Sequence, residues 1–151
     1  MEIITYDEGK SSDINDLVAL LSVLFNIEKD FNPDNYKQQK GLQLILENKV
    51  SATVQVARNK AGKVIGMVTA QLVISTAEGA TSAWVEDMVI DAAYRGQGIG
   101  KKLLENIGTW AKNKGATRAQ LLVDIENIDA IGYYEHLRWN STQLYARRIF
   151  L

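Results

Sequence analysis

The chain has 151 residues, 17 of them basic and 18 acidic, so its net charge is −1. This balance lacks the basic excess that binding to nucleic acid requires. The chain contains no cysteine and a single histidine, His136, which excludes disulfides, thiolate metal sites and multi-histidine metal sites. We therefore expect no metal, and a structural or surface role for His136.

The length fits one domain over residues 1–151. The N-terminus lacks the basic start and apolar run of a secretion signal. The longest apolar stretch, residues 17–25, is too short to span a bilayer. These features predict a single-domain cytoplasmic protein without a membrane segment.

Apolar spacing predicts a strand and two helices in the first third of the chain. Residues 3–6 read as a short strand. Apolar residues then recur at helical spacing from Ile14 to Phe25, after three residues whose side chains can cap a helix. Asn32 followed by Pro33 marks a second helix start, and that helix should run toward Glu47.

The apolar period then changes to that of a sheet. Three β segments should follow, then a helix that opens at a glycine-rich turn, a strand, a short helix and a last strand. This order predicts an α/β fold, with helices on the faces of a mixed sheet. The predicted ranges are 52–56, 63–74 and 83–90 for the three strands, 99–114 for the helix, and 119–123, 127–137 and 142–150 for the remaining elements.

Three glycines, Gly96, Gly98 and Gly100, lie where a strand leads into a helix. Glycines let the backbone approach a ligand closely, and a helix start offers free N–H groups with partial positive charge. Arg95, Lys101 and Lys102 add mobile positive charge. The segment therefore predicts a site for a phosphate or diphosphate.

Two common phosphate loops do not match this segment. A Walker loop needs a glycine where the chain has Arg95 and a serine or threonine where it has Lys102. A dinucleotide fingerprint needs its third glycine at Lys101 or Leu103.

Residues 95–100, Arg-Gly-Gln-Gly-Ile-Gly, match the spacing Arg/Gln-x-x-Gly-x-Gly/Ala. In this the chain resembles the GNAT (GCN5-related) N-acetyltransferase family, whose diphosphate loop has that spacing. The approach over residues 84–91 is similar, although the usual proline at Ala92 or Ala93 is absent. The resemblance implies the GNAT acyl-CoA N-acyltransferase fold, with a mostly antiparallel central sheet flanked by about four helices. It also implies transfer of an acetyl group from acetyl-CoA to an amine.

A later motif, Asn-x-x-Ala-x-x-Tyr-Tyr-Glu over residues 127–135, also resembles that family. Its Asn127, Ala130 and Tyr134 are three and four residues apart, so they share one helix face. The resemblance implies that Asn127 bonds the pantetheine arm, that Ala130 leaves room for the coenzyme, and that Tyr134 returns a proton to the thiolate. A phenol with a pKa of about 10 suits that donation.

The residues around this motif carry further expectations. We read Tyr133 as a core aromatic residue. The family usually ends this helix with Gly-Phe, where this chain has Arg138 and Trp139. We expect a different turn there, with Trp139 in the aromatic position.

The resemblance also implies that the strand before the glycine turn separates from its neighbouring strand at a bulge. Its backbone would then pair with the pantetheine amides, and one N–H would serve the thioester oxygen. The residues expected to bind acetyl-CoA are Met88, Val89, Ile90, Arg95, Gly96, Gln97, Gly98, Ile99, Gly100, Lys101, Asn127, Ala130 and Tyr134.

An attacking ammonium must first lose a proton, and two adjacent carboxylates, Glu86 and Asp87, lie in the strand expected to line the site. Strand alternation should send them to opposite faces, so that one faces the cleft. We prefer Glu86 as the catalytic base, with Asp87 as the alternative, and either could act through water.

In this family the segment between the first two helices walls the acceptor site. Here it carries Glu28 and Asp30, whose charges favour a cationic amine, with Phe31 and Trp84 as apolar walls. The sequence thus predicts a small cationic amine as acceptor. Acetylation of a protein N-terminus or lysine, or acyl-CoA sensing without turnover, remain alternatives. Dimers are common in the family, and the predicted last strand offers a surface for a homodimer.

Overall fold

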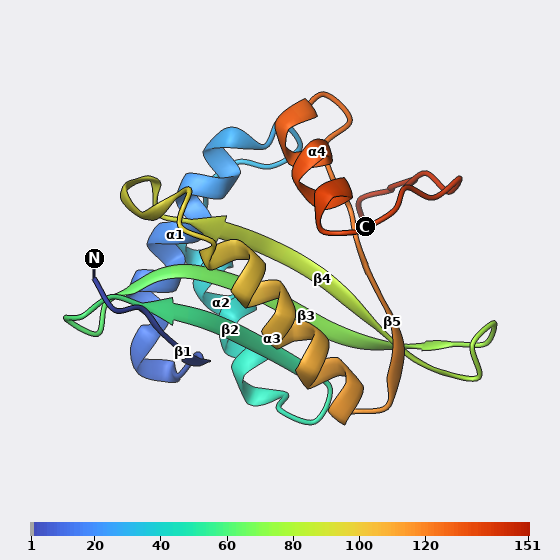
Figure 1. Ribbon diagram of the computed structural model, residues 1–151, viewed down its shortest axis with the longest axis horizontal. Helices are drawn as coiled ribbons and strands as arrows, with labels where there is room; N and C mark the ends of the chain where they lie inside the picture. Colours follow the sequence, from blue (N-terminus) through green and yellow to red (C-terminus); the bar gives the residue numbers. More distant parts are fainter. Residues whose placement is uncertain (1) are drawn as a thin grey trace.

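A five-stranded mixed sheet forms the centre of the chain, which the computed structural model describes from residue 2 to residue 151 (Figure 1). Neighbouring strands follow the sequence order, β1-β2-β3-β4-β5, and all pairs are antiparallel except β4–β5, which is parallel. A parallel pair needs a crossover connection, which α3 supplies. The strands are β1 (Thr5–Glu8), β2 (Ala52–Arg58), β3 (Val64–Ser75), β4 (Ala80–Ile90) and β5 (Ala116–Leu121). The helices are α1 (Ile14–Ile27), α2 (Asn35–Glu47), α3 (Ile99–Asn113) and α4 (Ile128–His136), with 3₁₀ turns η1 (Ser11–Asp13) and η2 (Ala92–Tyr94).

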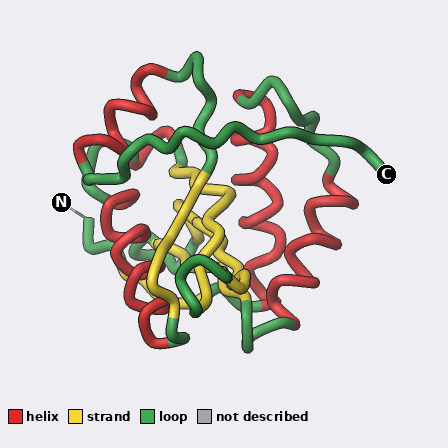
Figure 2. The backbone as a smooth tube through the Cα atoms, turned by 90° about the vertical axis from the view of Figure 1, so that its right-hand side faces the viewer, coloured by secondary structure: helices red, strands yellow, loops and turns green. Residues whose placement is uncertain are grey.

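Helices cover both faces of the sheet, so the central strands are buried on both sides. Figure 1 shows α3 in front of the sheet and α1 and α2 behind it, and Figure 2 shows the same layers edge-on. Leu17 and Leu42 pack with Met67 on the α1–α2 face. Leu103 and Ile107 fill the α3 face. Within residues 2–151, none of the helices combines the length and the apolar character that crossing a membrane needs.

The predicted element order is confirmed as far as α4, but the predicted last strand is wrong. Residues 137–151 form no helix or strand, and Leu144, Tyr145, Ile149 and Phe150 are 80 to 83% exposed. Adjacent arginines at 147 and 148 break the two-residue period of a strand, and one of them has an ionic partner elsewhere, as described below. The homodimer expected through this strand stays a prediction, without a formed strand to support it.

Arg58, at the end of β2, ties the N-terminal segment to the sheet. Its guanidinium donates to both carboxylate oxygens of Asp13, at 2.7 and 2.8 Å, and to Asp7 at 2.8 Å. The Asp13 and Arg58 side chains are 9% and 14% exposed. The guanidinium holds the pKa of the Asp13 carboxyl below its ordinary value. The pair therefore stabilises the fold above the pKa of an unfolded aspartate, and this contribution is lost as pH falls below it.

Replacing Arg58 tests this pair. Arg58→Met leaves the Asp13 carboxylate buried without its cation, so the free energy of unfolding should fall by about 3 kcal/mol at pH 7. Urea denaturation measures this, and the difference from the wild type should shrink as pH falls from about 4, where an unfolded aspartate becomes protonated, through the lowered pKa of Asp13. Lys60→Met, an exposed residue two positions later, is the control. A loss no larger than that of Lys60→Met would contradict the assignment.

Candidate active site

The glycine turn between β4 and α3 forms a bare backbone cradle. Gly96 and Gly98 have φ angles of 77° and 78°, in the left-handed region that favours glycine. A Cβ at either position would meet nothing within 4 Å, so both point into open space. The first bond within α3 runs from Lys102 N–H to the Gly98 carbonyl, at 3.2 Å. The amides ahead of it have no helix partner and are available to an anion.

Gly100 serves a different purpose from the other two glycines. A Cβ on it would lie 2.7 Å from Met88 Cε and 2.7 Å from Tyr133 Oη. Its φ is not positive, so this position needs the absence of a side chain rather than an unusual backbone angle. The glycine lets β4, α3 and α4 approach one another.

A cavity of about 330 Å³ opens where these three elements meet. Nine of the residues expected to bind the coenzyme line it, together with two that sequence reasoning did not assign to it, Tyr94 and Tyr133. The nine are Met88, Ile90, Arg95, Gly96, Gly98, Ile99, Gly100, Ala130 and Tyr134. The sequence therefore predicted most of a surface that three separate elements assemble.

Four expected residues lie outside the lining of this cavity. Val89 is 5% exposed and packs in the α1–α2 core. Gln97 and Lys101 are exposed at the turn. Asn127 caps α4, its side-chain oxygen accepting the Ala130 N–H at 3.0 Å.

The strand edge beside the cavity lacks a partner strand. Pairing of β4 with β5 ends at Val85–Leu121, although β4 continues to Ile90. Residues 86–90 therefore present backbone groups without a strand on that side. A register shift between Met67 and Thr69 of β3 marks a bulge in the same stretch of β4. Asp87 has a φ of 56° there, in the left-handed region.

The bulge decides where the two acids point. It adds a residue to β4, which breaks the alternation behind the expectation of opposite faces. The Thr69 hydroxyl donates to Asp87 Oδ2 at 3.2 Å, whereas Glu86 is exposed and accepts from Trp84 Nε1 at 2.5 Å. The charges of both acids raise the pKa of Glu28, at the end of α1.

Asp87 has the proton affinity of a general base. Burial, reinforced by the charge of Glu86, raises its pKa to about 6, against the lowering effect of the Thr69 hydrogen bond. Asp87 is thus mostly ionised at neutral pH and can accept a proton. Asp87 is the less exposed of the two acids and its pKa is raised. It is therefore our candidate for the base, while Glu86, preferred from the sequence, stays the alternative.

Tyr134 lines the cavity on α4 with its phenol protonated. Burial, with smaller effects of Tyr133 and Glu28, raises its pKa to about 12. Arg138, with a φ of 69°, ends the helix in the conformation that favours glycine. The amides of Arg138 and Trp139 donate to Glu135 and Tyr134 carbonyls at 2.9 and 2.8 Å. This Schellman motif sets the Trp139 ring against Tyr134, with centroids 6.3 Å apart.

We expected a different turn geometry after α4, because Arg138 stands where the family usually has glycine. Arg138 instead adopts a positive φ that glycine usually takes. Trp139 takes the aromatic position, as expected. Tyr133, read as a core residue, is 38% exposed. Its hydroxyl reaches Gly100 across the cavity. The sequence feature that could have indicated this position beside the cavity is that Tyr133 directly precedes Tyr134, on a neighbouring helix face.

The loop between α1 and α2 brings carboxylates toward this cavity. Glu28 is half-buried, and burial together with the charges of Asp87, Asp30, Glu86 and Asp124 raises its pKa. Lys29 forms an ion pair with Glu126, which joins the loop to the segment before α4. The loop thus faces both β4 and α4.

The predicted acceptor residues are only partly together. Phe31 packs against Phe25, with ring centroids 5.7 Å apart, and is 41% exposed. Trp84 is half-buried on β4 beside Glu86. Asp30 is exposed and pairs with Arg148 at 3.2 Å.

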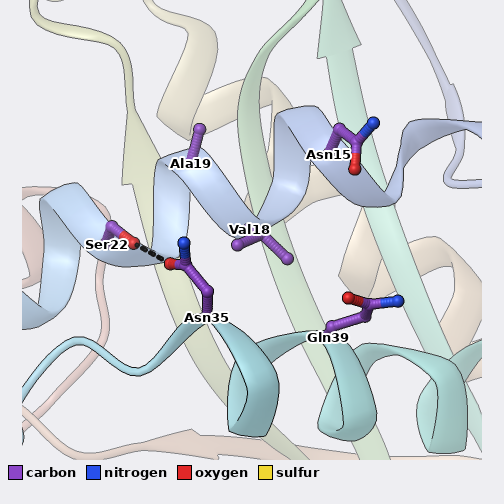
Figure 3. A pocket seen from close by; sticks show the side chains of 6 residues that line it. All are labelled: Asn15, Val18, Ala19, Ser22, Asn35 and Gln39. Atoms are coloured by element: carbon purple, nitrogen blue, oxygen red, sulfur yellow. Dashed lines mark hydrogen bonds between the residues drawn. The ribbon is translucent and has the colours of Figure 1, made fainter.

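A second cavity, of about 320 Å³, lies between α1 and α2 (Figure 3). Its walls are small and amide side chains, and Ser22 donates to Asn35 across it at 3.3 Å. No titratable side chain lines it, so it offers no group for acid–base catalysis. Across residues 2–151, His, Asp and Glu form no group of three or more that could hold a metal ion.

The comparisons with known proteins agree with this arrangement. The model of the acetyltransferase (GNAT) family matches residues 20–138. Mouse thialysine N-epsilon-acetyltransferase is 24% identical over 140 residues, covering 86% of this chain and 80% of that protein. Arabidopsis thaliana glucosamine-6-phosphate N-acetyltransferase superposes with a TM-score of 0.79 at 18% identity, over 99% of each chain. An aminoglycoside N-acetyltransferase in complex with CoA gives 0.80 at 16% identity, over 100% of this chain and 95% of that one.

The chain belongs to the acetyltransferase (GNAT) family. It has the fold of that family and is an acetyl-CoA-dependent N-acetyltransferase.

Proposed function

We propose that this chain transfers the acetyl group of acetyl-CoA to the primary amine of a small cationic molecule, by direct attack in a ternary complex. The observation that carries the proposal is the meeting of two features at β4. A bare glycine cradle lies beside an unpaired strand edge, and carboxylates from β4 and the α1–α2 loop gather nearby. The family relatives named above act, by their names, on thialysine, glucosamine-6-phosphate and aminoglycosides.

The cradle fits a diphosphate. Free amides at the start of α3 and the absence of side chains at Gly96 and Gly98 would hold its oxygens. The unpaired backbone over residues 86–90 would bind the pantetheine amides as an added strand. The coenzyme, when bound, supplies the acetyl group as a reactive thioester.

The chain's own residues move the protons. Asp87 accepts the proton that an ammonium must lose before it can attack, directly or through water. Tyr134, with its raised pKa, keeps a proton on Oη at neutral pH and donates it to the departing sulfur. Placing both substrates together supplies much of the rate. We propose one catalytic domain over residues 1–151, which the single sheet from β1 to β5 supports.

A panel of amines tests the assignment. Purified protein with acetyl-CoA should release free thiol with some members of a set of polyamines, amino acids and aminoglycosides. Preference for cationic acceptors over neutral amines is expected from Glu28 and Asp87. Acetylation of peptide termini alone would favour a protein substrate. Tight acetyl-CoA binding with no turnover on any amine would reveal an acyl-CoA sensor and end the proposal.

The cradle makes a prediction about coenzyme binding. Gly98→Ala forces a side chain into the left-handed region and into the open cradle. We expect acetyl-CoA affinity by calorimetry to fall by about tenfold, because the free turn relaxes away from the positive φ and binding must restore it, at a cost of roughly 1–2 kcal/mol. The matched control is Gly108→Ala, inside α3 with open space and no positive φ. It should keep full affinity and gain about 0.5–1 kcal/mol of stability. Equal affinity in the two variants would contradict the cradle.

Asp87 makes a prediction about pH. Log kcat/KM should rise more steeply below the Asp87 pKa of about 6 than above it, because both Asp87 and the amine lose protons there. Asp87→Asn should remove this break and lower kcat/KM by about 10²–10⁴-fold. In Glu86→Gln the break should persist at lower pH, because one charge that raises the Asp87 pKa is gone. A break that survives in Asp87→Asn would assign it to another group.

Tyr134 makes a prediction about turnover. Tyr134→Phe keeps the ring that packs on Trp139 but loses the proton donor, so kcat should fall by roughly 10²-fold with little change in acetyl-CoA affinity. Tyr36→Phe, at a tyrosine that is 75% exposed on α2, is the control. An unchanged kcat would remove Tyr134 from the mechanism.

A further inference from the structure

The C-terminal segment, residues 140–151, crosses the molecule from α4 toward the α1–α2 side of the sheet, where the chain ends (Figure 2). Arg148 is its anchor. The guanidinium pairs with Asp30 at 3.2 Å and lies over the Phe31 ring, 5.1 Å from the centroid. The segment's own Phe150 ring lies 5.9 Å away from the same guanidinium. A carboxylate and aromatic faces, the groups that bind organic cations, thus surround one side-chain cation.

This anchor lies in the loop that forms the acidic side of the candidate active site. Asp30 and Phe31 follow Glu28 in that loop. Lys29, between Glu28 and Asp30, pairs with Glu126, which lies just before α4 and so brings the loop to the α4 side of the cavity. A cation at Asp30 therefore lies on the same loop as Glu28, at its exposed outer part.

Among residues 2–151, little else holds the segment in place. The ion pair is open to water, since the Arg148 and Asp30 side chains are 42% and 67% exposed. Such exposed pairs stabilise weakly. Leu144, Tyr145, Ile149 and Phe150 are mostly exposed, and the Thr142 hydroxyl bonds only within the segment, to Leu144. A competing cation could displace Arg148 at small cost.

We propose that Asp30 and Phe31 form a second cation subsite of the acceptor site, and that Arg148 fills this subsite until an acceptor with two cationic groups displaces it. The inference rests on the proposed function, because it assumes an amine acceptor. Arg148 then determines specificity. An acceptor with a second cation must compete with Arg148, whereas a monoamine of the same length reaches Asp87 without disturbing the C-terminal segment.

Kinetics with paired acceptors test this. The acceptors are α,ω-diamines of three to six carbons and the monoamines of equal length. Arg148→Ala should lower KM for the best diamine by about five- to tenfold, the worth of one exposed ion pair with a cation–π contact, and leave the monoamine KM unchanged. Arg147→Ala removes the same charge from the neighbouring residue and should change neither value. Asp30→Asn should raise the diamine KM and abolish the effect of Arg148→Ala in the double variant.

The outcomes separate the two proposals. An unchanged diamine-to-monoamine KM ratio in Arg148→Ala would overturn the subsite and leave the acetyltransferase reaction standing. A KM that rises for both amines would also overturn it, since Arg148 would then be part of the acceptor wall.

A measurement without turnover gives an independent answer. In ¹⁵N relaxation experiments without acetyl-CoA, saturating diamine should increase the mobility of the amides of residues 142–151, and the matched monoamine should not. Asp30→Asn should show the mobile state from the start. Release by diamine in a protein that acetylates no amine would support the subsite while the proposed function fails. No release by any diamine would overturn the subsite.

Discussion

The early end of β4–β5 pairing is the constraint on which the site depends. The two strands run parallel as far as Val85 and Leu121, and β4 then continues alone to Ile90. In a fully paired sheet those backbone groups would be used by a neighbouring strand. Because they are not, the edge, the glycine cradle after it and α4 across from it enclose one cavity. The candidate binding surface thus includes a strand edge that the sheet leaves without a partner strand.

The bulge in the same strand adds chemistry to this opening. Holding Asp87 at a φ of 56° costs backbone strain of order 1 kcal/mol. The Thr69 hydroxyl and the surrounding sheet hold the carboxylate in that position. In this bulge Asp87 is half-buried beside Glu86, and burial together with that neighbouring charge raises its pKa to about 6. Strain, burial and like charge therefore act together at one residue.

The sequence predicted the element order through α4 and most of the cavity lining, because both follow from local patterns. Period, capping residues and the spacing of Gly96, Gly98 and Gly100 are all readable along the chain. The sequence could not show which face Glu86 and Asp87 take, since an inserted residue changes the alternation and only the pairing with β3 reveals it. The prediction of a last strand was wrong for a related reason. The local pattern of residues 142–150 resembles that of a strand, but a strand also needs a partner strand. The segment has none among the described residues, and its Arg148 pairs with Asp30.

Gly100 shows that the three glycines of the turn are constrained in different ways. At Gly96 and Gly98 the requirement is an angle, whereas at Gly100 it is a volume, because Met88 and Tyr133 already occupy the place where a methyl group would go. The close approach of β4 and α4 to α3 therefore depends on the hydrogen atom at one α-carbon. A larger residue at position 100 would displace the Met88 and Tyr133 side chains, both of which line the cavity. The shape of the cavity would then change although the φ angles of the turn stayed the same.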